Sequence, residues 1–350
     1  MTRQPLHDHR RQIAALTLLA MLAIPGCNSV RAADTPPPVI DMHLHALPLA
    51  EFVPLGGPAP IPHCVPMTDY PVADSGARVA ENFRSRNLEC HATWSPVTDD
   101  EVREKTLAIM KRHNIYAVTN GSLIARWVEA APDRIIPSLG FAGGPEAPTV
   151  AEVRRRIQEG GFKVFGEVTA QYGGIAPDDS SLEPYWALTE EIGIPVSIHI
   201  GTGPLGAPYM GFDRYRARLH SPLSLEEVLL RHRKLRVNIM HAAWPMLDDL
   251  LAVLWTHPQV YVDTGAIAWA LPRAEFHRYL QRIVEAGFGK RVLFGSDQMI
   301  WPETIEMALD SIESASFLSA EQRRDILFNN GARFLRLSPE RIAQMSQSRN

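Results

Sequence analysis

Eight short runs of apolar, β-favouring residues recur along this 350-residue chain, and segments with helical periodicity separate most of them. Strands that alternate with helices form a parallel sheet, because the connection between two parallel strands is normally a helix. Eight such units close into a (β/α)8 barrel, the TIM barrel of the α/β class. We predict this fold, with strands at Val39–His45, Ile115–Thr119, Arg134–Phe141, Phe162–Val168, Pro195–Ile200, Arg236–His241, Val260–Thr264 and Arg291–Asp297.

Several of the predicted helices begin with a hydroxyl residue that is followed three positions later by Glu or Gln, the pattern of a capping box. The predicted N-terminal caps are Thr98, Thr149, Ser224 and Ser319. The helices themselves are predicted at Asp99–His113, Ala151–Glu159, Pro184–Ile192, Leu225–His232, Met246–His257 and Arg273–Ala286.

The first 26 residues differ from the rest, with arginines ahead of an apolar run that is too short to span a membrane. We interpret residues 1–26 as a signal peptide. Cys27 follows a sequence that resembles a bacterial lipoprotein cleavage site and would carry the lipid; the alternative is ordinary cleavage after Ala32. Both predict an exported, periplasmic protein. A tether at 27–38, the barrel at 39–337 and a tail at 338–350 would follow.

The overall composition fits a soluble globular protein, with 45% hydrophobic and 21% charged residues. A formal net charge of −4, with Lys and Arg scattered along the chain, argues against nucleic acid as a partner. We expect a small-molecule substrate and membrane contact only through the lipid anchor. The sequence predicts no particular oligomeric state.

The main irregularity is the long Pro- and Gly-rich stretch at 46–96, between the first strand and its helix. A βα loop lies on the catalytic face of a barrel, so we interpret it as a lid or pocket wall. It contains Cys64 and Cys90, which we predict to form a disulfide in an oxidising compartment. The alternative is a metal site that also uses His63 and His91, although the short spacing of a metal knuckle is missing.

Polar side chains fall at the ends of five predicted strands. His43 and His45 lie two positions apart, so they share one face of the first strand. In a parallel barrel all carboxyl ends meet at one face, where these side chains can converge. Four imidazoles and two carboxylates suit zinc, or manganese, iron or cobalt, better than calcium or magnesium. The predicted metal ligands are His43, His45, Glu167, His199, His241 and Asp297.

Spacing within the strands supports this convergence, because residues two apart point to the same side of a strand. The pairs expected to point inward together are Ser197 with His199, Ile239 with His241, and Gly295 with Asp297.

Two of the acidic residues have structural alternatives. Glu167 could be the buried ion-pair partner of an arginine, and Asp263 is predicted to cap a turn.

The ordered set of His-x-His, a histidine on the fifth strand, a histidine on the sixth and Phe294-Gly295-Ser296-Asp297 after the eighth resembles the amidohydrolase superfamily. The segment Ser319–Leu337 resembles the closing segment of its amidohydrolase-related branch of metal-dependent hydrolases, which includes aminocarboxymuconate-semialdehyde decarboxylase. The resemblance covers most of residues 39–337.

The resemblance implies that His43, His45 and Asp297 hold a first metal ion. In mononuclear members His199 completes that site, and His241 stays free as an acid or base. In binuclear members His199 and His241 hold a second ion, and a residue on the fourth strand bridges the two.

Binuclear relatives use a carboxylated lysine or a glutamate as the bridge. Glu167 resembles the glutamate form, whereas Lys163 would lie nearer the bottom of the barrel. We favour the binuclear interpretation with Glu167 as the bridge.

A metal ion lowers the pKa of bound water from 15.7 toward about 7 and polarises the substrate oxygen. We therefore predict a metal-dependent hydrolase, most consistent with zinc, whose metal-bound hydroxide cleaves an ester, lactone, amide or phosphoester bond. The resemblance implies that Asp297 shuttles the proton. The alternative is a mononuclear zinc-dependent decarboxylase with His241 as acid or base. A lesser alternative is a non-catalytic binding barrel at the cell surface.

Aromatic and polar residues that follow the strand ends suggest a pocket wall, although such rings can also pack the loops themselves. The predicted substrate-binding residues are Gln171, Tyr172, Trp244, Trp269 and Met299, with Tyr209 and Trp301 of the same kind. Arg214, Arg216 and Arg218 either bind an acidic group or are solvated surface. Histidines predicted to be surface or loop residues are His63, His91, His220, His232, His257 and His277.

Overall fold

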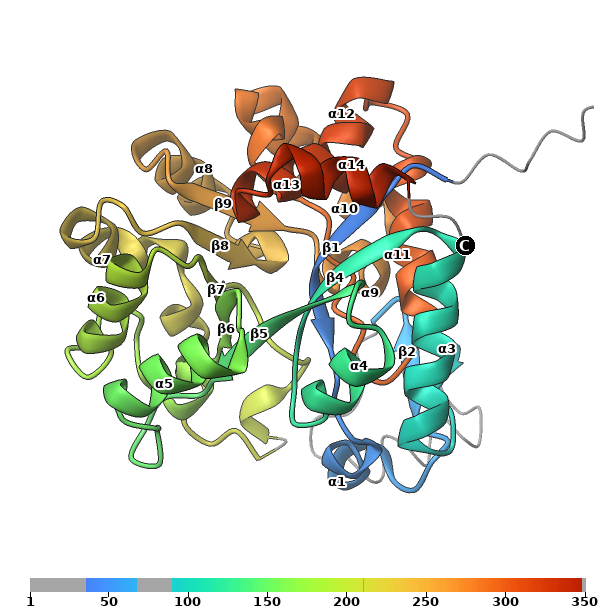
Figure 1. Ribbon diagram of the computed structural model, residues 1–350, viewed down its shortest axis with the longest axis horizontal. Coiled ribbons are helices and arrows are strands. Elements are labelled where there is room, and N and C mark those ends of the chain that lie inside the picture. The colour runs from blue at the N-terminus through green and yellow to red at the C-terminus, as the bar shows by residue number, and fades with distance from the viewer. Residues whose placement is uncertain (1–35, 68–89, 210, 348–350) are drawn as a thin grey trace, which may run out of the picture. The chain divides into compact units, whose positions relative to one another are not determined.

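The computed structural model of the chain describes residues 36–67, 90–209 and 211–347. Eight parallel strands form one sheet in the order β1-β4-β5-β6-β7-β8-β9-β10, and a parallel bridge between Leu44 and Gln298 links its two edges. Helices surround these strands (Figure 1), which confirms the predicted TIM barrel. The strands are β1 (Val39–His45), β4 (Ile115–Asn120), β5 (Ile135–Phe141), β6 (Val164–Val168), β7 (Val196–His199), β8 (Val237–Met240), β9 (Val260–Asp263) and β10 (Val292–Leu293).

All eight predicted strands form, and the largest difference is at the end of the last one. β10 contains only Val292 and Leu293, whereas we predicted a strand that continues to Asp297. Its ladder with β9 ends where Leu293 pairs with Asp263. Residues 294–297 are not part of a strand, and Asp297 has a φ of 52°.

All six predicted helices form. Thr98, Thr149 and Ser319 each accept a hydrogen bond from the backbone N–H three residues later, so these caps are confirmed. The cap at Ser224 is wrong, because Ser221 begins a 3-10 turn there and its side chain accepts from Leu223 N. The helices are α1 (Val53–Gly56), α3 (Asp99–Arg112), α4 (Ile124–Ala130), α5 (Val150–Gly160), α6 (Glu183–Ile192), α7 (Glu226–Arg231), α8 (Leu247–Thr256), α9 (Ile267–Ala270), α10 (Arg273–Ile283), α11 (Thr304–Glu313), α12 (Ala320–Arg324), α13 (Asn330–Leu335) and α14 (Pro339–Gln347).

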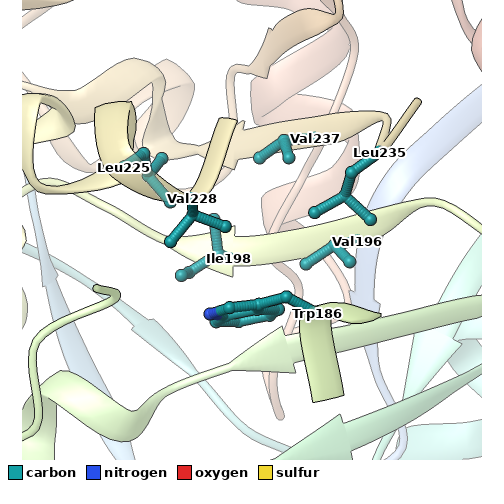
Figure 2. Close-up of a pocket in the computed structure, with 7 residues that line it drawn as sticks. All are labelled: Trp186, Val196, Ile198, Leu225, Val228, Leu235 and Val237. Atoms are coloured by element: carbon teal, nitrogen blue, oxygen red, sulfur yellow. The ribbon is translucent and has the colours of Figure 1, made fainter. Parts of the chain in front are cut away.

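The main core lies between the strands and the helix layer. Figure 2 shows one part of it, where side chains of β7 and β8 face those of α6 and α7 across a small gap. The single polar group in the lining, the Trp186 indole N–H, donates to Pro177 O at 2.9 Å. With no polar atom left to orient a ligand, this gap belongs to the core. Its lining residues are Trp186, Val196, Ile198, Leu225, Val228, Leu235 and Val237.

The C-terminal helices pack against the outer face of β1. Ile40 and Met42 lie in one apolar cluster with Phe328, Phe334 and Met345, all buried. Met345 belongs to α14, so residues beyond 337 also contribute to the core of the barrel unit.

The long loop after β1 carries an antiparallel hairpin of β2 (Pro62–Val65) and β3 (His91–Trp94). Cys64 and Cys90 form the predicted disulfide, with a sequence separation of 26. The alternative metal site built from these cysteines with His63 and His91 is therefore wrong, because both sulfurs are committed to the disulfide.

The predicted signal peptide, the lipidated Cys27 and most of the tether lie outside the described residues. Among the residues that are described, no helix combines the length and apolarity that a membrane crossing requires.

Candidate metal centre

All six predicted ligands meet at the carboxyl end of the barrel. His45 Nε2 lies 2.9 Å from Asp297 Oδ1, and His43 Nε2 lies 3.3 Å from the same oxygen. On the other side of the site, His199 Nδ1 lies 2.7 Å from Glu167 Oε1 and 3.0 Å from His241 Nε2. The side chains of these residues are buried or nearly so.

Glu167 lies between two pairs of histidines. Its Oε2 is 3.8 Å from His43 Nε2 and 3.5 Å from His45 Nε2. Its Oε1 is 2.7 Å from His199 Nδ1 and 3.8 Å from His241 Nε2. Every ion-pair contact of Glu167 in the described chain is with a histidine, so the alternative of a buried arginine partner is wrong. Each carboxylate oxygen thus faces one histidine pair.

The alternative bridge, Lys163, precedes β6 and is exposed, at the opposite end of the strand from Glu167. Gly166 allows the backbone of β6 to approach β7 closely. A Cβ at Gly166, which has a φ of 149°, would collide with the carbonyl oxygen of Ser197. Only glycine therefore fits immediately before Glu167.

The donor set fits a divalent cation. Two groups have ligand atoms within 4.8 Å of one another: His43 with His45 and Asp297, and His43 with Glu167 and His241. His43 Nε2 is also buried without a hydrogen-bond partner among the described residues. A buried nitrogen of this kind is normally satisfied, and a metal ion would satisfy it here.

Hydrogen bonds outside the cluster decide which ring nitrogen of each histidine faces inward. His43 Nδ1 lies 3.4 Å from Asp263 Oδ1, and His45 Nδ1 lies 2.9 Å from Asn120 Oδ1. His241 Nδ1 lies 3.0 Å from the carbonyl oxygen of Gly265. Because these oxygens accept the Nδ1 hydrogen, the Nε2 lone pairs of the three rings are left for a metal.

His199 has the opposite orientation. Its Nδ1 faces Glu167, and its Nε2 lies 3.3 Å from the hydroxyl of Tyr172. The side-chain amide of Gln171 donates to the carbonyl oxygen of His199 at 2.7 Å. Two predicted substrate-binding residues therefore support this histidine directly.

Asp263 has a larger role than the predicted turn cap. It does cap the turn, because Oδ1 accepts from Gly265 N at 2.9 Å, which confirms that prediction. The same oxygen also accepts from His241 N at 3.0 Å and faces His43 Nδ1. Sequence reasoning missed this contact to His43, since the two residues are 220 positions apart.

The electrostatics of the site favour ionised carboxylates. Burial raises the pKa of Glu167, but its close contacts with the rings of His199, His241 and His43 outweigh that effect and hold the pKa well below its usual range. Burial also raises the pKa of Asp297, but the charge of His43 and the close contact with His45 lower it below the ordinary value. Two buried negative charges among imidazoles provide an environment that attracts a cation.

The predicted inward pairing of Ile239 with His241 is wrong. Val237 faces the helices, so Ile239 shares that outer face, while Asn238 points inward and donates to Asp263 Oδ2 at 2.7 Å. His241 lies beyond the end of β8, and its φ of 58° interrupts the strand alternation and returns its ring to the site.

The remaining predicted pocket residues differ in their environment. Trp269 is 3% exposed and donates from Nε1 to Ser296 O at 2.6 Å. Trp244 is half-buried and donates to Glu275 Oε1 at 3.3 Å, and Met299 is half-buried against the core. Tyr209 is 73% exposed. Arg214, Arg216 and Arg218 are all exposed, as expected for solvated surface.

Three histidines predicted to be surface or loop residues are buried instead: His220, His232 and His257, at 0%, 7% and 4% exposure. Their loops pack inward, which the polar character of histidine does not reveal in sequence. The His220 ring centroid lies 5.4 Å from that of His199, and burial lowers the pKa of His220 to about 3.

Solved structures with the same fold are distant in sequence. 5-Carboxyvanillate decarboxylase from Sphingomonas paucimobilis is 15% identical, with a TM-score of 0.55 over 86% of this chain and 99% of that chain. Dihydroxybenzoic acid decarboxylase from Polaromonas sp. JS666, with bound manganese and an inhibitor, is 16% identical. Its TM-score is 0.53 over 87% of this chain and 99% of that chain. 4-Oxalomesaconate hydratase from Rhodopseudomonas palustris is 16% identical, with a TM-score of 0.50 over 85% of this chain and 95% of that chain.

No curated protein matches the chain. A family model described as amidohydrolase matches residues 40–337, which include all six candidate ligands. The chain therefore belongs to the amidohydrolase family.

Proposed function

We propose that this protein is a metal-dependent hydrolase with two divalent cations, most consistent with zinc, bridged by Glu167. The observation that carries the proposal is the position of that side chain, with one carboxylate oxygen toward His43 and His45 and the other toward His199 and His241. A carboxylate between two imidazole pairs can join two ions, whereas a single ion would use only one of its oxygens.

The two ions would have different ligands. His43, His45 and Asp297 would hold the first ion, and His199 and His241 the second. A cation bound there would lower the pKa of a water molecule and polarise the scissile carbonyl or phosphoryl oxygen. The mixture of imidazole and carboxylate ligands suits zinc and also manganese, the metal in the Polaromonas decarboxylase.

Asp297 is the proton carrier in this proposal. Its Oδ1 faces the two histidines of β1, and its Oδ2 lies 3.8 Å from His241 Nδ1. The lowered pKa keeps the carboxylate ionised, so Oδ2 can accept the proton of the attacking water and return it to the leaving group. The bond cleaved would be an ester, lactone, amide or phosphoester.

Metal analysis tests the proposal most directly. We expect two zinc or manganese ions per wild-type chain and about one in Glu167→Gln, with Glu313→Gln at an exposed position of α11 as the matched control. We also expect Asp297→Asn to lose turnover of ester, lactone and phosphoester substrates while it keeps the fold. Two ions in Glu167→Gln, or full activity in Asp297→Asn, would contradict the proposal.

The second candidate is a mononuclear decarboxylase of the branch that includes aminocarboxymuconate-semialdehyde decarboxylase, with His241 as acid or base. It is supported by the fold shared with two proteins named as decarboxylases. One tightly bound ion, CO2 release from an aromatic acid and a dispensable Glu167 would favour it. Failure to bind any transition metal would favour a non-catalytic binding barrel.

We also propose that the protein is exported and anchored through a lipid on Cys27. The Cys64–Cys90 disulfide supports export, because such bonds persist in oxidising compartments. Membrane fractionation of wild type and Cys27→Ala tests the anchor. We expect the variant to leave the membrane fraction, and equal membrane association would contradict the proposal.

A further inference from the structure

The disulfide-linked hairpin of β2 and β3 is held at the edge of the metal centre. Trp301 Nε1 donates to Ile61 O at 2.9 Å, and Met67 N donates to Ala270 O at 2.6 Å. Trp301 follows β10 and Ala270 ends α9, which follows β9. Because the loops after the strands form the catalytic face of the barrel, these bonds fix the hairpin on that face.

His63 is the hairpin residue that packs against these loops. Its ring centroid lies 5.1 Å from that of Trp269 and 4.8 Å from that of Trp301, both in edge-to-face geometry. Its Nδ1 lies 3.0 Å from the carbonyl oxygen of Cys64. A carbonyl oxygen only accepts, so Nδ1 carries the hydrogen, and the lone pair on Nε2 of the neutral ring has no partner among the described residues.

One aromatic contact links this ring to the segment that carries Asp297. Trp269, which His63 contacts, donates to the carbonyl oxygen of Ser296, the residue before Asp297. Burial lowers the pKa of His63 to about 4, while the negative charge of Asp297 acts on it in the opposite direction. At neutral pH, therefore, the site edge carries an uncharged hydrogen-bond acceptor.

We propose that His63 contacts the substrate, with Nε2 accepting a hydrogen bond from a hydroxyl or N–H group beside the scissile bond. This inference rests on the proposed hydrolase function and narrows its substrate class to molecules that carry such a donor. The contact is non-covalent, and no proton is transferred. Trp269 and Trp301 fix the plane of the ring, and the adjacent Cys64 ties its strand to β3.

Chemical modification tests the contact without any turnover. The zinc-loaded full chain is treated with diethyl pyrocarbonate, and acylation of each histidine is followed by peptide mass spectrometry with and without inorganic phosphate. At ten times its dissociation constant, phosphate should slow acylation of His63 about tenfold. His91, exposed on the paired strand β3, is the control and should react at an unchanged rate. No protection of His63, or equal protection of both histidines, would overturn the proposal.

A pair of esters tests the substrate class. Methyl mandelate has a hydroxyl beside the scissile carbonyl, and methyl phenylacetate lacks it. We expect His63→Ala to lower kcat/KM about fivefold for the mandelate, mainly through KM, the size expected for one neutral hydrogen bond. The phenylacetate and the control His91→Ala should be little affected, and the metal content should not change.

The outcomes separate the two proposals. An equal loss on both esters would overturn the proposed role of His63 and leave the hydrolase function intact. If the wild type hydrolyses neither ester, the hydrolase function loses support, and the protection experiment alone decides whether His63 faces the bound molecule.

Discussion

The Asp263→Asn variant tests whether Asp263 orients the His43 ring for metal binding. Asp263 Oδ1 lies 2.9 Å from Gly265 N, 3.0 Å from His241 N and 3.4 Å from His43 Nδ1. Its Oδ2 accepts from Asn238 Nδ2 at 2.7 Å. The substitution keeps the size of the side chain, removes its charge and replaces one acceptor with an NH2 group.

The cost to stability should be small. The new amide will keep its oxygen toward Gly265 and His241 and place its NH2 group toward Asn238, where two donors would meet. That clash can relax, because Asn238 Oδ1 is buried without a hydrogen-bond partner among the described residues and a flip of the Asn238 amide would turn it toward the new NH2 group. We expect a loss of about 1 kcal/mol in the free energy of unfolding, the lower end of the range for a disturbed buried hydrogen bond.

The cost to metal binding should be larger. A carboxylate that accepts the outer N–H of a ligating histidine raises the basicity of its ring, and loss of such a partner typically weakens metal affinity about 10- to 100-fold. His43 belongs to both candidate ligand groups, so the affinity for the ion that His43, His45 and Asp297 would hold should fall. The factor corresponds to about 1.4 to 2.8 kcal/mol of binding free energy.

Zinc affinity is measured by competition with a chromophoric chelator, and stability by urea unfolding of the metal-free protein. Asp133→Asn, at an exposed position before β5, is the matched control. Wild-type zinc affinity in Asp263→Asn would refute the role assigned to Asp263. A stability loss equal to the affinity loss would instead indicate a general structural defect.

Three further predictions concern other parts of the barrel. Leu225→Ala, in the apolar gap of Figure 2, should cost about 2 to 5 kcal/mol in urea unfolding without changing metal content. Burial raises the pKa values of Glu183 and Glu190, but hydrogen bonds and charge from His232 help to lower both below 4.5. Their stabilisation is present above that pH and is lost on acidification, so His232→Gln should be less stable than wild type at pH 6, and this difference should shrink as the pH falls below 4.5. A difference independent of pH would contradict this. Gly166→Ala should bind less metal, because its Cβ would displace β6 from β7, and wild-type metal content would contradict that expectation.

The fold and the positions of the candidate ligands could be predicted because both depend on short-range patterns. His43 and His45 share a face through the two-residue period of a strand, and a parallel barrel brings the carboxyl ends of all its strands together. These rules needed only the order of the elements and the last residues of each strand.

Features that depend on backbone exceptions or distant partners could not be predicted in this way. His241 reaches the site through a left-handed residue after the strand, where alternation no longer applies. The inward orientation of the His199 ring depends on Tyr172, and that of His43 depends on Asp263, 220 residues away. The burial of His220 likewise results from loop packing, and no local pattern distinguishes it from an exposed loop histidine.

The length of the Glu167 side chain gives the last and sharpest test of the bridge. In the strand order, β6 is adjacent to β7, whereas β4 and β5 separate it from β1. A side chain on β6 that contacts both His199 and the two histidines of β1 must therefore extend across the barrel mouth. Aspartate keeps the charge but is one methylene shorter, so in Glu167→Asp it should still reach the adjacent His199 and lose the β1 pair. We expect this variant to bind fewer ions than wild type while its urea midpoint changes little, as measured by metal analysis alongside unfolding. If Glu167→Asp still bound two ions, the length of the Glu167 side chain would not be what allows it to bridge them.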